Sequence, residues 1–226
     1  MKNPFVLSIQ ASTLLLLLAC GAQKGNNHQA KDNSDVRAVE LASAAPATKA
    51  TAAFAEGCFW CVEEIFEAVV GVDSAVSGYA GGTTTDPTYD KVNTETTGHA
   101  ETVLVYYDPA QVSYEELVRV FYLSHDPTTP NQQGPDRGSS YRSILFYSTP
   151  EEKQIAERVT ADMNQSRYKN RIVTEIKPLE AFYRAEGYHQ DYVIHNPNNP
   201  YVRGVSIPRF ELFKKTYTGK LKSTHP

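Results

Sequence analysis

Apolar and polar residues repeat along this chain with two different periods, which predict strands and helices. Short apolar or alternating segments predict strands at 51–56, 72–79, 99–107, 144–147 and 172–177. Apolar residues three and four positions apart predict helices at 62–69, 117–124, 155–163 and 182–194. After Pro197 the sequence has no clear period. Because strands and helices do not alternate strictly, this order predicts an α+β fold, a two-layer α/β sandwich.

The first 20 residues have the pattern of an export signal. Lys2 gives a positive start, the apolar run 14–18 follows, and Leu18-Ala19-Cys20-Gly21 ends it with small residues and a cysteine. The run is too short to span a bilayer. This arrangement resembles a bacterial lipoprotein signal, which is cut before the cysteine and lipidated on it. We therefore expect lipidation at Cys20, with an ordinary secretory leader as the alternative.

The segment that follows the signal is polar. Residues 21–50 contain mostly Gln, Asn, Lys, Asp, Ser, Ala and Thr, with little that could pack, which predicts a flexible tether. Residues 51–220 then form one folded domain, long enough for a sizeable core. We expect this domain to lie outside the cytoplasm, anchored by lipid to a membrane of the bacterial cell envelope.

The most informative motif is Gly57-Cys58-Phe59-Trp60-Cys61, at the junction of a predicted strand and a predicted helix. Unpaired amides at a helix start stabilise negative charge, so we expect Cys58 to have a lowered pKa. Residues three apart are neighbours on a helix, and this spacing lets Cys61 attack an oxidised Cys58 and close a disulfide. Two alternatives stay open: both cysteines extend an apolar stripe and could be buried, or they form half of a zinc site.

The strand at 99–107 carries a candidate acid. Glu101 heads a row of valines on one face of this strand, and both faces are apolar enough for an inner strand. A carboxyl in such a setting has a raised pKa and can act as a general acid. The alternative, which the sequence alone favours, is a glutamate at a strand end that faces water.

Composition narrows the class of partner. The formal charge of −4 becomes −5 if the signal with Lys2 is removed, and neither value suggests nucleic acid. Fourteen tyrosines would suit a pocket that holds a polar atom and a methyl group together. Of three cysteines one belongs to the leader, which leaves a single pair and no disulfide framework.

Several separate motifs, in order along the chain, resemble the A-type peptide-methionine sulfoxide reductases. They are Gly57-Cys58-Phe59-Trp60, Tyr79-Ala80-Gly81-Gly82, Pro87-Thr88-Tyr89, Gly98-His99-Ala100-Glu101, His125-Asp126-Pro127-Thr128, Gly134-Pro135-Asp136, Tyr141-Arg142-Ser143 and Tyr188-His189-Gln190-Asp191-Tyr192. The resemblance implies a two-layer sandwich with a ferredoxin-like core. It also implies reduction of the S epimer of methionine sulfoxide, free or in oxidised proteins, as a repair reaction.

The resemblance also assigns roles to residues. It implies that Cys58 is the nucleophile, that Glu101 protonates the sulfoxide oxygen, and that Tyr89 and Tyr141 hydrogen-bond this oxygen. Three further residues complete the implied pocket: Asp136 as its aspartate, and Phe59 and Trp60 as the aromatic walls around the methyl group.

The chain departs from many family members at its end. Those members carry resolving cysteines in a C-terminal tail, whereas the tail 201–226 has none, and Cys61 stands where others have glycine. We therefore expect Cys61 to resolve the Cys58 sulfenic acid. Thioredoxin or another dithiol would then recycle a monomer that binds no cofactor or metal. Rival hypotheses are a thioredoxin-like CxxC oxidoreductase and a non-enzymatic lipoprotein that binds metal through this pair.

The lipoprotein expectation can be tested in living cells. If Cys20 is lipidated, the protein takes up radioactive label when cells grow with a labelled fatty acid. An unlabelled wild-type protein would end the lipoprotein hypothesis and favour an ordinary secretory leader.

Overall fold

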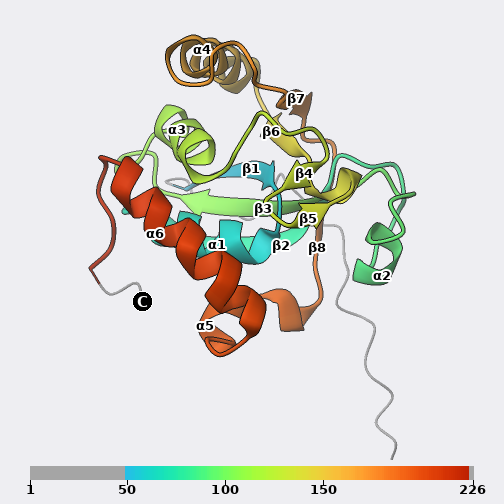
Figure 1. The fold of residues 1–226 in the computed structure, drawn as a ribbon. Helices are drawn as coiled ribbons and strands as arrows, with labels where there is room; N and C mark the ends of the chain where they lie inside the picture. Colours follow the sequence, from blue (N-terminus) through green and yellow to red (C-terminus); the bar gives the residue numbers. More distant parts are fainter. Residues whose placement is uncertain (1–48, 224–226) are drawn as a thin grey trace, which may run out of the picture. The chain divides into compact units, whose positions relative to one another are not determined.

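The computed structural model describes residues 49–223, so the expectations for the signal, for Cys20 and for most of the tether lie outside the described residues. Within this range the fold is α+β, with a mixed six-stranded sheet and helices packed on it (Figure 1). The strands of this sheet are β1 Ala50–Glu56, β2 Val72–Ala80, β3 Ala100–Tyr107, β6 Ser143–Tyr147, β7 Glu175–Pro178 and β8 Phe182–Arg184. The α-helices are α1 Phe59–Glu67, α2 Tyr89–Val92, α3 Tyr114–Ser124, α4 Pro150–Ser166, α5 Tyr192–His195 and α6 Ile207–Thr216. None of the helices within 49–223 has the length and apolar character needed to span a lipid bilayer.

The strand order is β7-β6-β1-β3-β2-β8. All neighbouring pairs are antiparallel except β6 and β7, which run parallel. β3 lies between β1 and β2, so the expectation of an inner strand at 99–107 is confirmed. The predicted strands at 51–56, 72–79 and 144–147 are also confirmed within a residue or two.

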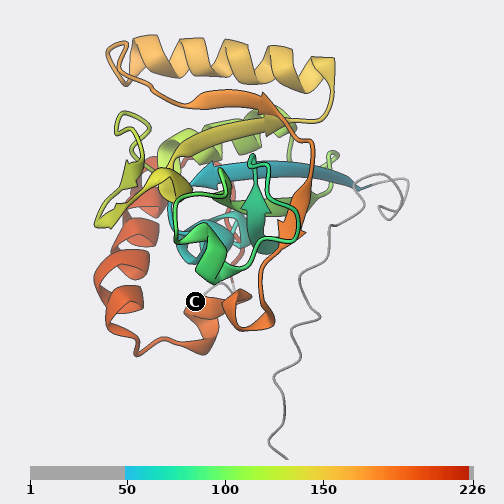
Figure 2. The same cartoon turned by 90° about the vertical axis from the view of Figure 1, so that its right-hand side faces the viewer.

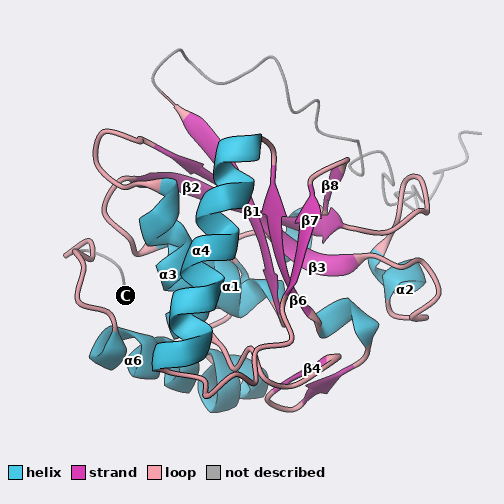
Figure 3. Ribbon diagram, turned by 90° about the horizontal axis from the view of Figure 1, so that it is seen from above, coloured by secondary structure: helices cyan, strands magenta, loops and turns pink. Residues whose placement is uncertain are grey.

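The two faces of the sheet are packed differently. Phe54, Val103 and Val105 belong to a large core that also holds the buried residues of α1, α3, α4 and α6. The opposite face carries a second, smaller cluster with several alanines, among them Ala53 and Ala55. In Figure 3 the helices α3, α4 and α6 accordingly gather to one side of the strands. The expected ferredoxin-like core stays a prediction.

The sheet curls strongly from edge to edge. The edge strands β7 and β8 are joined by only residues 179–181, which reach about 14 Å when fully extended. Six flat strands would separate these edges by about 24 Å. Figure 2 shows the orange chain passing directly from one edge strand to the other. The alanines on the second face leave room for this curl because they are small.

One prediction near the end of the domain is wrong. The expected helix at 182–194 begins as strand β8, because Phe182 packs over Gly78 of β2, where an added Cβ would lie 2.3 Å from the Phe182 ring. Its remainder is a 3-10 turn at Gly187–His189, then Asp191 with φ 52°, then the short α5. The tail without a clear period forms a π-helix, η3 (Val202–Ser206), followed by α6.

The long segment between α3 and β6 is ordered by short elements. β4 (Gln132–Gln133) and β5 (Asp136–Arg137) form a small hairpin, and η1 (Ser139–Tyr141) is a 3-10 turn. The helices on either side begin with capping residues. Ser113 accepts the Glu116 amide before α3, and Thr149 accepts the Glu152 amide before α4.

Removal of the Phe54 ring should destabilise the domain. Phe54 is fully buried and stacks on Phe66 with 4.7 Å between ring centroids. We expect Phe54→Ala to lower the free energy of unfolding by about 3–5 kcal/mol in urea denaturation, because the truncation leaves a cavity in the core. The control Val173→Ala, at a residue 43% exposed, should change it by about 0.5 kcal/mol or less. Equal effects of the two variants would contradict this account of the core.

Candidate active site

A tight turn after β1 places Cys58 at the start of α1. Gly57 has φ 90°, a conformation that favours glycine. A Cβ at this position would also lie 2.5 Å from the Gln133 side chain, so there is no room for a larger residue. Cys58 is the N-cap of α1, and its carbonyl accepts the amides of Cys61 (3.1 Å) and Val62 (3.3 Å). The strand-to-helix junction predicted from the sequence is therefore present.

The two thiols of the motif are in contact. Cys58 and Cys61 are free, buried, and joined by a side-chain hydrogen bond. The expectation that the spacing makes them neighbours is confirmed. The two differ in access, because Cys58 lines a pocket at 6% exposure whereas Cys61 is 1% exposed and is not among the residues lining that pocket.

The expectation of a lowered pKa for Cys58 is wrong. Burial raises the pKa of this thiol well above its usual range, and the proximity of Cys61 and Glu101 acts in the same direction. The side chain of Cys58 makes no capping hydrogen bond to the helix, and the first amide of α1, that of Phe59, donates to Glu101 instead. The amide at the helix start therefore hydrogen-bonds the Glu101 carboxyl, and the Cys58 thiol keeps its proton.

Glu101 is buried at 2% exposure, so the alternative in which it faces water is wrong. Its Oε2 accepts the Phe59 amide at 3.0 Å. Burial raises the pKa of Glu101 to about 8, against the lowering effect of that hydrogen bond, and the charge of Asp136 adds to the rise. A carboxyl with this pKa carries a proton at neutral pH and can donate it.

Cys58 and Glu101 line the same pocket, which has a volume of about 310 Å³. The complete lining is Cys58, Phe59, Trp60, Tyr89, Glu101, Asp136, Tyr141, Asn199 and Tyr201. The structure thus brings together every residue expected in the pocket, with Cys61 directly behind Cys58. Sequence reasoning missed Asn199 and Tyr201, which come from the segment after Pro197.

Separate contacts hold the two expected tyrosines. The Glu95 carboxylate accepts hydrogen bonds from the Ser139 hydroxyl and the Ser140 hydroxyl, each at 2.7 Å. These bonds fix the η1 turn that carries Tyr141. The Tyr89 amide donates to Glu186 at 2.9 Å at the start of α2. Burial raises the pKa of both tyrosines, so their hydroxyls keep their protons and can donate hydrogen bonds into the pocket.

Trp60 is held in place from two sides. Its indole N–H donates to Nδ1 of His189 at 3.0 Å, and its ring stacks on Tyr192 with 3.7 Å between centroids. Burial lowers the pKa of His189 to about 4, so the imidazole is neutral and accepts this bond. His189 therefore orients Trp60 as a hydrogen-bond acceptor.

Tyr201 connects the tail to the reactive thiol. Its hydroxyl donates to Oδ2 of Asp136 at 2.5 Å and makes a further hydrogen bond with Cys58. A chain of hydrogen bonds thus runs from Asp136 through Tyr201 and Cys58 to Cys61. No periodic pattern predicted this contact, and a lone tyrosine after Pro200 was its only trace in the sequence.

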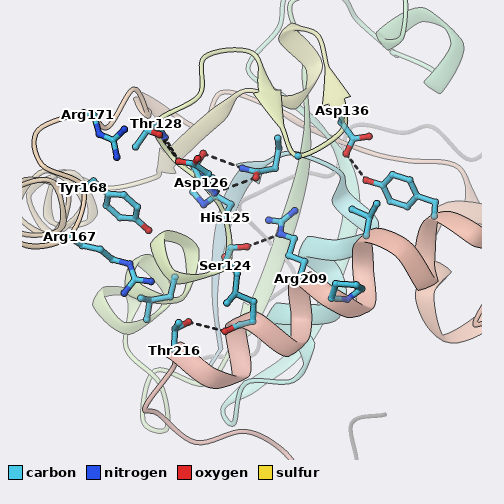
Figure 4. Close-up of a pocket in the computed structure, with 17 residues that line it drawn as sticks. Ser124, His125, Asp126, Thr128, Asp136, Arg167, Tyr168, Arg171, Arg209 and Thr216 are labelled. Atoms are coloured by element: carbon cyan, nitrogen blue, oxygen red, sulfur yellow. Dashed lines mark hydrogen bonds between the residues drawn. The ribbon is translucent and has the colours of Figure 1, made fainter.

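Metal binding by the CxxC pair finds no support within residues 49–223. The one group of three or more possible metal ligands found there is Glu63, Glu67 and Asp191, and it includes neither cysteine. A larger cavity of about 650 Å³ shares Asp136 and Tyr201 with the small pocket, and Figure 4 shows Arg209 and Ser124 among its lining. It lacks the thiols and Glu101, so the small pocket is the candidate active site.

The sequence of this chain matches one family throughout the described domain. A model of the family described as peptide methionine sulfoxide reductase matches residues 50–221. The peptide methionine sulfoxide reductase MsrA of Natronomonas pharaonis is 47% identical over 175 residues, which cover 77% of this chain and 98% of the relative. The MsrA of Sulfolobus acidocaldarius is 46% identical over 164 residues, or 73% of this chain and 93% of the relative.

Solved structures of methionine sulfoxide reductases are also similar to this chain. Methionine sulfoxide reductase A of Corynebacterium diphtheriae has a TM-score of 0.65 and 36% identity, over 68% of this chain and 78% of that one. Reduced Mxr1 from Saccharomyces cerevisiae has a TM-score of 0.66 and 31% identity, over 74% and 92%.

The raised pKa of Glu101 predicts a pH dependence of stability. Between its ordinary value of 4.5 and about 8, the carboxyl is ionised in the unfolded chain and protonated in the folded one. The folded state then binds more protons, so the free energy of unfolding falls as pH rises through this window. We expect Glu101→Gln to make this fall shallower in urea titrations from pH 5 to pH 8. Some slope should remain, because burial also raises the pKa of Glu63 to about 8.

The matched control for this titration is Glu180→Gln, since Glu180 is exposed. The control should keep the slope of the wild type. If Glu101→Gln also kept that slope, Glu101 would not hold a proton at neutral pH.

Proposed function

The chain belongs to the peptide methionine sulfoxide reductase family, MsrA, and reduces methionine sulfoxide to methionine; we propose that Cys58, Glu101 and Cys61 carry this reaction. The observation that supports these roles is the shared pocket, in which a buried, protonated carboxyl and a thiol meet between aromatic walls. The thiol accepts the oxygen and the carboxyl primes the substrate.

In the first step Glu101 donates its proton to the sulfoxide oxygen, which makes the sulfur electrophilic. Cys58 attacks that sulfur as its own proton is lost, and the oxygen moves from the substrate to Cys58. Methionine is released, Cys58 becomes a sulfenic acid, and the Cys58 proton restores Glu101. Because Cys58 and Glu101 are both neutral before the substrate binds, neither residue places a charge in the buried pocket.

The remaining lining residues bind the substrate. Tyr89 and Tyr141 supply hydroxyls for the sulfoxide oxygen, and Phe59 and Trp60 hold its methyl group and sulfur. Asp136 acts through Tyr201, to which it is hydrogen-bonded at 2.5 Å. The pocket of about 310 Å³ has room for a methionine side chain.

In the second step Cys61 attacks the sulfenic acid on Cys58, water leaves, and a Cys58–Cys61 disulfide forms. The contact between the two thiols supports this assignment. Thioredoxin or a similar dithiol then returns both cysteines to thiols. The Leu18-Ala19-Cys20-Gly21 signal supports a lipid-anchored enzyme that repairs oxidised envelope proteins or free methionine sulfoxide.

The first step is tested by single-turnover kinetics with methionine sulfoxide, in which released methionine is measured without a reductant. We expect Cys58→Ser to be inactive. Glu101→Gln should be slower by about a hundredfold or more, the usual contribution of a general acid. In the wild type the rate should fall as pH rises through about 8, because Glu101 loses its proton in this range. This fall should be absent in Glu101→Gln.

The control Glu180→Gln should match the wild type at every pH. Activity that survives in Cys58→Ser, or full activity in Glu101→Gln, would contradict the assigned roles. A thioredoxin-like oxidoreductase would instead reduce insulin disulfides and would not depend on Glu101.

A further inference from the structure

The disulfide proposed above would have one accessible sulfur and one enclosed sulfur. Cys58 lines the catalytic pocket, whereas Cys61 is 1% exposed and lies behind it. A thiolate from a reductant must reach a sulfur atom to break the bond. The catalytic pocket leads it to Cys58, so the direction of attack follows from the packing.

The C-terminal segment contacts Cys61 through Ser206. The π-helix η3 ends at Ser206, whose hydroxyl lies 3.2 Å from the Cys61 sulfur and is itself 1% exposed. Single π turns are rare and concentrate at functional sites. A thiol donates to this hydroxyl, and the hydroxyl can rotate to donate to a thiolate.

Arg209 adds a fixed positive charge three residues further on. Its guanidinium donates to the carbonyls of Ser124 (2.7 Å) and Glu56 (3.0 Å) and is only 13% exposed. Figure 4 shows the bond from Arg209 to Ser124. The Glu56 carboxylate, 3.2 Å away, balances this charge but is shared with His125 at 3.1 Å and with the Ser124 hydroxyl.

Charged and polar groups from several elements influence the pKa of Cys61. The hydrogen bond from Cys58 lowers the pKa of Cys61 against the opposing effect of burial, and Arg209 and Ser206 lower it further. Asp136 acts in the opposite direction, and Glu101 also faces this thiol. Cys61 is thus the member of the pair in which negative charge is stabilised.

We propose that the reductant attacks the sulfur of Cys58 through the catalytic pocket and that Ser206 and Arg209 hold Cys61 as the leaving thiolate. The reductant sulfur bonds to Cys58, the bond between the two cysteines breaks, and its electron pair stays on Cys61. The second thiol of the reductant then displaces Cys58 and closes the reductant disulfide. This inference rests on the proposed role of Cys61 as resolving thiol.

One consequence is that a single pocket serves two reactants in turn. Methionine must leave before the reductant thiolate can react, because both approach the same Cys58 sulfur through this pocket. Ser206 and Arg209 are positioning residues in this scheme, since they touch neither substrate nor reductant. A thiol that is more acidic leaves faster, which is how they accelerate the step.

The direction of attack is tested by trapping. The enzyme is first oxidised by one turnover with methionine sulfoxide, and mass spectrometry identifies the Cys58–Cys61 disulfide. It is then mixed with excess thioredoxin whose second cysteine is replaced by serine, and the mixed disulfide is mapped by peptide mass spectrometry. We expect thioredoxin on Cys58. Thioredoxin on Cys61 would overturn this inference alone, whereas a lasting sulfenic acid on Cys58 beside a free Cys61 would overturn the proposed resolving role.

The role of the leaving group is tested with Ser206→Ala. Disulfide opening by thioredoxin should slow about tenfold, and the pH at which the ultraviolet absorbance of the Cys61 thiolate appears in the reduced enzyme should rise. Ser206→Thr keeps the hydroxyl and should restore most of both. The matched control is Thr216→Ala, which removes a hydroxyl about 15 Å further along the same segment. Equal opening rates in Ser206→Ala and this control would contradict the role given to Ser206.

Discussion

The hydrogen bond from the Phe59 amide to the Glu101 carboxyl is the contact on which the site depends. It joins the first turn of α1 to β3, a central strand of the sheet, and so fixes Cys58 and Glu101 on two neighbouring rigid elements. Sites built on strands and helices hold their geometry better than sites on loops. The same bond occupies the helix amide that would otherwise stabilise a Cys58 thiolate. Both reactive groups therefore keep their protons at rest, and a protonated thiol resists unproductive oxidation.

The remaining parts of the site come from segments far apart in the sequence. α2, β5 and η1 supply Tyr89, Asp136 and Tyr141, and the tail supplies Tyr201 and Ser206. Tyr89 and Tyr141 are fixed by contacts that are not themselves part of the chemistry, with the Glu186 carboxylate for Tyr89 and the Glu95 carboxylate under η1 for Tyr141. The arrangement separates functions: the sheet and α1 hold the reacting atoms, and the outer segments shape the pocket around them.

Local sequence patterns predicted those parts of the fold whose causes are local. The alternation of β3 and the strand-to-helix junction at Cys58 both depend on residues close together in the sequence. The strand β8 could not be read in the same way, because its pairing with β2 and the packing of Phe182 over Gly78 are tertiary contacts. The pKa of Cys58 was mispredicted for a similar reason. It depends first on burial and then on the proximity of Cys61 and Glu101, and both the burial and the contact with Glu101 are tertiary features.

The position of Tyr201, Ser206 and Arg209 near the end of the chain has a consequence for biosynthesis. A ribosome makes the CFWC motif early and these three residues last, so a nascent chain carries both sulfurs before anything encloses them. The enclosure that distinguishes the two cysteines arises only when synthesis is nearly complete. A chain released too early would keep the motif but leave its second sulfur open to any oxidant it meets.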